Sequence, residues 1–149
     1  MSLQIWLNSG WLQQHKTSPE EIRDLWLVVD RDLKAAAATP SPDWQYFIAY
    51  NAALKLCTIL LYAEGYASGR GQGSHVRPIN ALPLILGEAR RGDADYLDGC
   101  RQKRHQGEYE HIGGTTRQDV DTLVEFCHEL RAAVLAWLKE KHPQLVPPA

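Results

Sequence analysis

The chain has 149 residues, of which 44% are hydrophobic and 23% are charged, a composition typical of a globular domain and unlike that of a disordered chain. At this length a single domain buries roughly 70% of the surface that its unfolded chain would expose, so we expect one hydrophobic core. Sixteen Lys and Arg against eighteen Asp and Glu give a net charge of −2. This balance excludes a general positive field that would hold long nucleic acids nonspecifically.

The three cysteines, Cys57, Cys100 and Cys127, have spacings that match no metal-binding motif. We expect buried free thiols in a reducing compartment. The N-terminus has no cationic segment followed by an apolar run, and no apolar stretch approaches the roughly 20 residues that span a bilayer. These features predict a soluble, cytoplasmic protein.

Residues 1–17 form an N-terminal apolar arm, in which Trp6, Trp11 and Leu12 flank an Asn-Ser-Gly turn. Because such side chains are costly to leave in water, we expect the arm to dock on the rest of the chain or on a second subunit. The first long helix is predicted to start at Ser18 as N-cap, with Glu21 completing a capping box. Thr39-Pro40 is expected to end it.

A second helix is predicted from about Pro42 to Ala67, after another start signal at Ser41-Pro42-Asp43. Its apolar and aromatic residues lie on nearly all sides, which is typical of the central helix of a bundle or of a helix that also faces a partner subunit. A glycine-rich loop that ends at His75 follows.

Three further helices are predicted beyond that loop. A short apolar helix contains Pro83 and ends at Gly87 or soon after it, and Asp93 is expected to cap the next helix. Thr116 or Thr115 is expected to cap the last one. Its apolar seam comprises Val120, Leu123, Val124, Cys127, Leu130, Val134, Trp137 and Leu138.

We find no alternating run long enough for a strand. The sequence therefore predicts an all-α, antiparallel four- to five-helix bundle over residues 18–142, followed by a frayed tail at residues 143–149.

Charged and polar residues crowd together near the end of the penultimate predicted helix, between Cys100 and Gly114, where no apolar seam explains them. This stretch is the first candidate for a functional site. The candidate catalytic residues are Arg104, His111 and His105. The candidate ligand-binding residues are Arg101, Lys103 and Tyr109, together with His75 from the glycine-rich loop.

The pattern over about residues 20–141 resembles the HEPN domains (higher eukaryotes and prokaryotes nucleotide-binding), which are small α-helical bundles that usually pair as dimers. The residues that carry the resemblance are Tyr50, Ala53, Leu54, Glu64-Gly65-Tyr66, His75 and the stretch from Asp98 to Tyr109. The resemblance implies a homodimer. In catalytic members it also implies a metal-independent ribonuclease at the dimer cleft, and it suggests a role in a toxin-antitoxin or defence system.

The resemblance implies an Arg, a polar residue after it and a His a little further on, and these positions fall on Arg104, His105 and His111. The commoner spacing falls on Tyr109, so that Tyr and His are exchanged, and the sequence leaves open whether the site cleaves RNA or only binds it. At about 100° per residue, Arg104 and His111 share one face only if the helix continues past Gly107. A His suits the base that takes the 2′-hydroxyl proton, and an Arg suits stabilisation of the phosphorane.

Other interpretations stay open. Lys and Arg near the C-terminal end of a helix are also favoured by the helix dipole, so this stretch is equally explained as a solvated helix end without a functional site. The aromatic helix and the arm also suit a non-enzymatic module that binds a partner protein, such as a nucleotidyltransferase, or a small nucleotide ligand. Two Glu-x-x-His pairs, ending at His111 and His128, resemble half of a di-iron site, but the second points away from the seam, and we expect no metal or cofactor.

Overall fold

The structure is a computed structural model that describes residues 2–109 and 114–148, and of residues 105–109 it describes the backbone alone. In these ranges six α-helices pack together with two short strands and two 3-10 turns. The helices are α1 (Leu3–Asn8), α2 (Pro19–Ala38), α3 (Pro42–Ala63), α4 (Arg77–Leu86), α5 (Arg91–Tyr109) and α6 (Arg117–Lys141). The strands are β1 (Leu12–Gln14) and β2 (Tyr66–Ser68), and the turns are Glu88–Arg90 and Pro143–Leu145.

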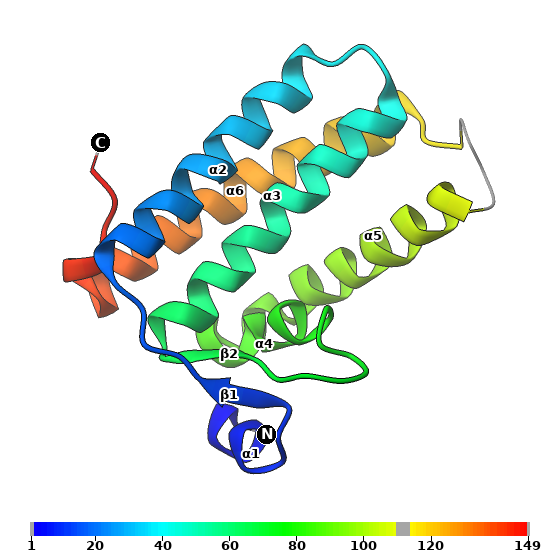
Figure 1. The fold of residues 1–149 in the computed structure, drawn as a ribbon. Helices are drawn as coiled ribbons and strands as arrows, with labels where there is room; N and C mark the ends of the chain where they lie inside the picture. Colours follow the sequence, from blue (N-terminus) through cyan, green and yellow to red (C-terminus); the bar gives the residue numbers. More distant parts are fainter. Residues whose placement is uncertain (1, 110–113, 149) are drawn as a thin grey trace.

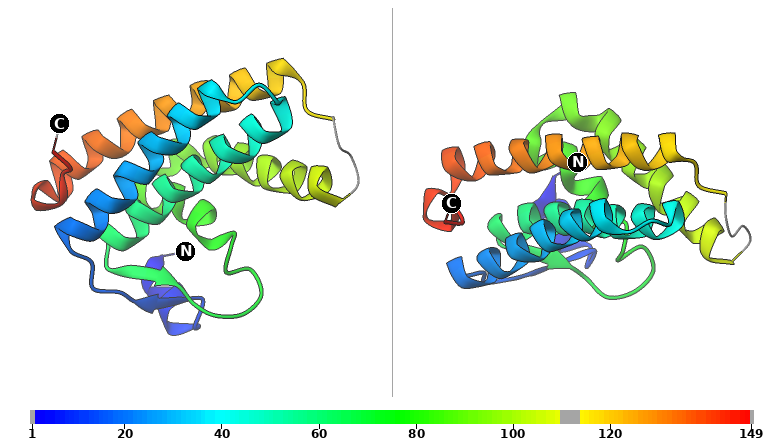
Figure 2. Two further views of the ribbon diagram at one scale, coloured as in Figure 1. Left: turned by 45° about the horizontal axis from the view of Figure 1, so that its top comes forward. Right: turned by 90° about the horizontal axis from the view of Figure 1, so that it is seen from above.

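Helix α3 is the centre of the molecule and packs against α2, α4, α5 and α6 (Figure 1). It forms an antiparallel hairpin with α2, while α6 crosses behind α3 in Figure 1 and lies beside it in the views of Figure 2. The prediction of a mainly helical bundle is therefore confirmed. Within residues 18–142, the described part of the chain contains five helices, α2 to α6, and the arm adds the short α1 as a sixth, which the prediction for the bundle did not include.

The absence of strands was a wrong prediction. Strands β1 and β2 pair in antiparallel fashion, with Leu12 opposite Ser68 and Gln14 opposite Tyr66. The second predicted helix consequently ends at Ala63 and not at Ala67, because the chain turns through Gly65 and enters β2. Each strand has only three residues and finds its partner far away in the sequence, so neither shows an alternating pattern.

The N-terminal arm docks on its own chain. Trp6 and Leu12 are buried, and they form a small second core with Leu61 and Ala81. Arg77 of α4 also binds the arm. Its Nη1 donates to the Trp11 carbonyl oxygen at 2.8 Å, and its guanidinium lies 4.6 Å from the centre of the Trp11 ring. Trp6 is thus unavailable to a partner protein in this arrangement.

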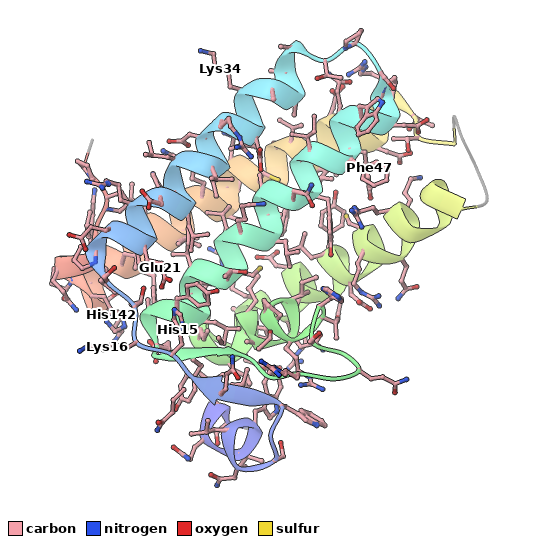
Figure 3. All side chains as sticks on the ribbon, in the orientation of Figure 1. His15, Lys16, Glu21, Lys34, Phe47 and His142 are labelled. Carbon is pink, nitrogen blue, oxygen red and sulfur yellow. The ribbon has the colours of Figure 1, made fainter. Side chains whose placement is uncertain are left out.

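Two histidines lie where the arm and the C-terminal segment meet the bundle (Figure 3). His15 Nε2 is 2.7 Å from Glu21 Oε1, and the His15 ring lies 4.1 Å from the ring of Tyr62. His142 Nε2 is 3.2 Å from Glu64 Oε1. These contacts fix both ends of the chain to the same end of the bundle.

The arm also depends on a glycine. A Cβ added at Gly69 would lie 2.3 Å from the Gly10 carbonyl oxygen, a distance at which the backbone must shift. Gly69→Ala should therefore loosen the β1–β2 pair and lower the free energy of unfolding by about 1–3 kcal/mol, as overpacking does. Thermal unfolding and limited proteolysis of the arm measure the effect.

Gly99→Ala is the matched control for Gly69→Ala. Gly99 lies in α5, and a Cβ there would meet nothing within 4 Å. The control should leave stability unchanged or raise it by up to about 1 kcal/mol. Equal stability of the two variants would contradict the close approach of Gly69 to the arm.

The predicted starts of α2 and α6 are correct, whereas the predicted start of α5 is wrong. Ser18 caps α2 by accepting from the Glu21 backbone N–H, and Thr116 caps α6 in a complete capping box with Asp119. The Glu21 side chain does not close the predicted box, because it accepts from Thr17 and contacts His15 instead. Asp93 does not cap α5 either: the helix starts earlier, at Arg91, after the 3-10 turn.

The core contains the predicted buried residues. All seam residues of α6 are buried except Val124, which is half-buried against the core. Cys57, Cys100 and Cys127 are buried free thiols, as predicted. Burial raises the pKa of Cys57 and of Cys127 to about 12, so both are neutral thiols. The tail differs from the expected frayed end, because Leu145 is buried in the main core.

Helix α3 alone, among the described residues, is long and apolar enough to cross a membrane by length and hydropathy, contrary to the expectation that no stretch would be. Of its most apolar 18-residue window, 61% is buried inside the structure. Its composition is therefore explained by its central place in the bundle.

Candidate functional site

A pocket of about 300 Å³ lies between the first two turns of α3 and the last part of α5. Its lining residues carry three aromatic rings, two cationic groups, three hydroxyl groups and one carboxylate. The lining residues are Ser41, Asp43, Trp44, Tyr46, Phe47, Lys103, Arg104 and Thr115. Three further pockets have linings that include none of the predicted site residues.

The aromatic wall is set by the start of α3. Pro42 fixes the first turn of the helix, and Trp44 and Phe47, three positions apart, then fall on one face with their ring centres 5.9 Å apart. Trp44 is 63% exposed, although it is the largest side chain of the pocket. Figure 3 shows Phe47 on the part of α3 that lies beside α5.

A buried glutamine anchors this first turn. Gln45 points away from the pocket, and its Nε2 donates to the Ala36 carbonyl oxygen at 2.8 Å. Its Oε1 accepts from Arg117 Nη1 at 2.7 Å. The end of α2, the start of α3 and the start of α6 are therefore tied together directly behind the aromatic wall.

The cationic wall comes from α5. Arg104 lies with its guanidinium 4.7 Å from the centre of the Phe47 ring and 5.7 Å from that of Tyr50, which is cation–π geometry. Such stacking fixes the plane of the guanidinium and removes part of its hydration. Arg104 is thus held in place at the pocket before any ligand arrives.

Lys103 is held by an acid of the next helix. Its Nζ donates to Asp119 Oδ2 at 2.9 Å and lies 5.9 Å from the centre of the Tyr46 ring. The hydrogen bond from the Thr116 backbone and the contact with Lys103 keep the pKa of Asp119 below its usual range, so the carboxylate stays charged. One carboxylate therefore caps α6 and positions a cation of the pocket.

The phenols of Tyr46, in the lining of the pocket, and of Tyr50, next to Arg104, are unsuited to act as bases. Burial raises the pKa of Tyr50 to about 12, even though Arg101 and Arg104 favour its ionised form. Burial, together with a hydrogen bond to Cys100, raises the pKa of Tyr46 further above its usual value. Both phenols remain neutral near pH 7 and act as packing and hydrogen-bonding groups.

Of the predicted site residues whose side chains the structure describes, two line the pocket and two lie outside it. Lys103 and Arg104 line the pocket. Arg101 lies on α5 outside the pocket and pairs with Asp98 at 2.9 Å. His75 is exposed in the loop before α4 and does not line the pocket.

The remaining predicted residues are His105, Tyr109 and His111. Helix α5 continues through Gly107 as far as Tyr109, so the glycine does not end the helix early. The side chains of His105 and Tyr109, and His111 as a whole, lie outside the described residues.

Sequence reasoning missed the aromatic half of the pocket. Trp44 and Phe47 were interpreted as part of an apolar helix surface, and Asp43 as part of a helix start. A tryptophan in the first turn of a helix, next to an acid and away from the apolar seam, was the available signal.

A metal site has no support from the described residues, which contain no group of three or more His, Cys, Asp or Glu side chains able to hold an ion. Glu125 and His128 are exposed on α6, as the seam predicted.

Comparison of the chain with protein-family models, with curated proteins and with solved structures finds no significant match.

Proposed function

We propose that the protein binds RNA and holds one unpaired nucleotide in the pocket between α3 and α5. The observation that carries the proposal is the meeting of Trp44 and Phe47 with Lys103 and Arg104 in one pocket of about 300 Å³. Proteins that recognise single-stranded RNA stack unpaired bases on aromatic rings and guanidinium planes and place cations against the phosphates.

The size of the pocket supports a single nucleotide as its occupant. Ligand pockets commonly range from about 300 to 1,000 Å³, so this one is at the small end. The chain is slightly acidic overall, with a net charge of −2, so attraction of phosphate has to be local. Lys103 and Arg104 supply that local charge next to the exposed Trp44 ring.

Cleavage is the second part of the proposal and rests on the resemblance to HEPN domains. Two copies of the chain would form a homodimer in which Arg104 stabilises the charge on the phosphorane, and His111 or His105 takes the 2′-hydroxyl proton, without a metal. The rigid stacking of Arg104 on Phe47 supports this role, because a preorganised guanidinium needs little rearrangement in the transition state. A place in a toxin-antitoxin or defence system belongs to the same proposal.

Binding of a fluorescent single-stranded RNA, measured by anisotropy, tests the first part. Arg104→Ala should weaken binding by about fivefold or more, because loss of one stacking or charged contact of about 1–3 kcal/mol has that effect. Lys139→Ala is the matched control, since it removes one exposed cation from the far end of α6 and should leave the affinity unchanged. Equal affinity of the wild type and Arg104→Ala would contradict the proposed pocket.

Incubation of the same RNA with the wild type in EDTA tests the second part. The products should end in 2′,3′-cyclic phosphate, and Arg104→Ala and His111→Ala should remove the activity. The mass in solution should be that of a dimer. RNA that is bound but left intact would reduce the function to binding, and cleavage by a monomer would contradict the shared cleft.

A further inference from the structure

We propose that the pocket between α3 and α5 selects guanine, and that Asp43 is the residue that recognises it. This inference rests on the proposed function and adds the identity of the base. Asp43 is the one acid among the described residues that line the pocket, and it directly precedes Trp44, the ring on which a base would stack.

The charge distribution in the pocket is two-sided. Lys103 and Arg104 lie on the α5 wall, and Asp43 lies on the α3 wall. A ligand that fits both walls carries an anionic group at one end and hydrogen-bond donors at the other, with a flat ring between them for the aromatic side chains. A nucleotide whose base is rich in donors meets all three requirements.

The chemistry of a carboxylate then distinguishes the four bases. An ionised carboxylate only accepts hydrogen bonds. On its Watson–Crick edge, guanine presents two adjacent donors, the N1–H and the exocyclic amino group, which match the two oxygens of Asp43. Adenine and cytosine each place a ring-nitrogen lone pair beside their amino group, and uracil places two carbonyl oxygens around its single N–H. Only guanine meets the carboxylate without opposing an acceptor to it.

The acceptor capacity of Asp43 is sufficient for this role. Asp43 already has an interaction within the chain. An ionised carboxylate has about four lone-pair sites on its two oxygens, so an existing contact leaves room for a paired approach by a base. Asp43 is also half-buried, which strengthens a hydrogen bond relative to one in open water.

An acid in the first turn of a helix has a second effect, because it stabilises the positive end of the helix dipole. That effect acts on stability and makes no distinction between bases. The preference for one base over another is therefore the measurement that isolates recognition by Asp43.

The experiment measures competition by four free nucleotides, GMP, AMP, CMP and UMP, against the fluorescent RNA. A second arm uses uridine pentanucleotides whose central base is G, A or C, which separates recognition of free nucleotides from recognition of RNA. The guanine ligands should bind about tenfold or more tightly than the others, as a good paired contact between a side chain and a base provides. Asp43→Asn should remove most of this preference, while the binding of the uridine-only RNA should stay within about twofold.

Two further variants make the test specific. Asp95→Asn changes the net charge equally from an exposed position on α5 and should retain the guanine preference. Asp43→Ser, which keeps a residue suited to the first turn of a helix, should behave like Asp43→Asn and replaces it if Asp43→Asn fails to fold.

Each outcome decides between the two proposals. Binding of all bases with equal affinity would overturn guanine selection and leave RNA binding standing. A guanine preference that survives in both Asp43 variants would overturn the role of Asp43. Failure of every RNA and nucleotide to bind would overturn the proposed function and, with it, this inference.

Discussion

Leu56→Ala is expected to lower the free energy of unfolding by about 2–5 kcal/mol, the usual cost of removing a fully buried leucine. Leu56 lies in the middle of α3 and has no exposed surface. Because α3 packs against four other helices, the cavity would open at the centre of the core, where no single neighbour is free to move in and fill it. Chemical denaturation, followed by the loss of helical circular dichroism, measures the effect.

Leu27→Ala is the control for Leu56→Ala. Leu27→Ala removes the same side-chain atoms from α2, but Leu27 is 58% exposed. Its cost should stay within about 0.5 kcal/mol, as is usual on a surface. A similar cost at both positions would contradict the central place of α3.

Gln45→Leu is expected to destabilise the protein by about 1–3 kcal/mol and also to weaken RNA binding. The substitution leaves the buried Ala36 carbonyl without the amide that it accepts from, and it leaves Arg117 without its 2.7 Å acceptor. Since the hydrogen bonds of Gln45 hold the first turn of α3 in place, their loss would let Trp44 move away from its position in the pocket. Denaturation gives the first effect, and anisotropy with the fluorescent RNA gives the second.

A double-mutant cycle separates the contact with Arg117 from the contact with Ala36. Arg117→Met alone removes one of the two hydrogen bonds of Gln45, and the two substitutions together should cost less than the sum of the single costs, by about 0.5–3 kcal/mol. Additive costs would show that Gln45 and Arg117 stabilise the protein independently. Gln118→Leu, next in sequence on α6 but away from Gln45, should show no coupling.

The parts of the fold that could be predicted depend on local sequence. Ser18 and Thr116 start helices because a side-chain oxygen next to a suitable backbone forms a cap regardless of the rest of the protein. The α6 seam could be predicted because its period is that of a helix. Strand β2 could not, because Tyr66 and Ser68 become a strand only through pairing with the distant Leu12 and Gln14.

The cations of the candidate site could be predicted from the sequence, whereas its aromatic residues could not. Lys103 and Arg104 stood out because cations without an apolar seam are visible in the sequence. Trp44 and Phe47 did not, because whether an aromatic residue of a central helix is core or pocket wall depends on where α5 crosses α3. Glu21 shows the same limit on a smaller scale: its sequence position indicated a capping box, but the nearby His15 and Thr17 attract its carboxylate instead.

The pairing of β1 with β2 constrains the order in which the molecule folds. During synthesis the arm leaves the ribosome before α2 and α3, and its partner strand β2 emerges only after the whole of both helices. During that interval Trp6 and Leu12 lack Leu61 and Ala81, the residues against which they pack, so the nascent chain exposes an apolar segment. The docking of the arm therefore follows the completion of the central helix α3.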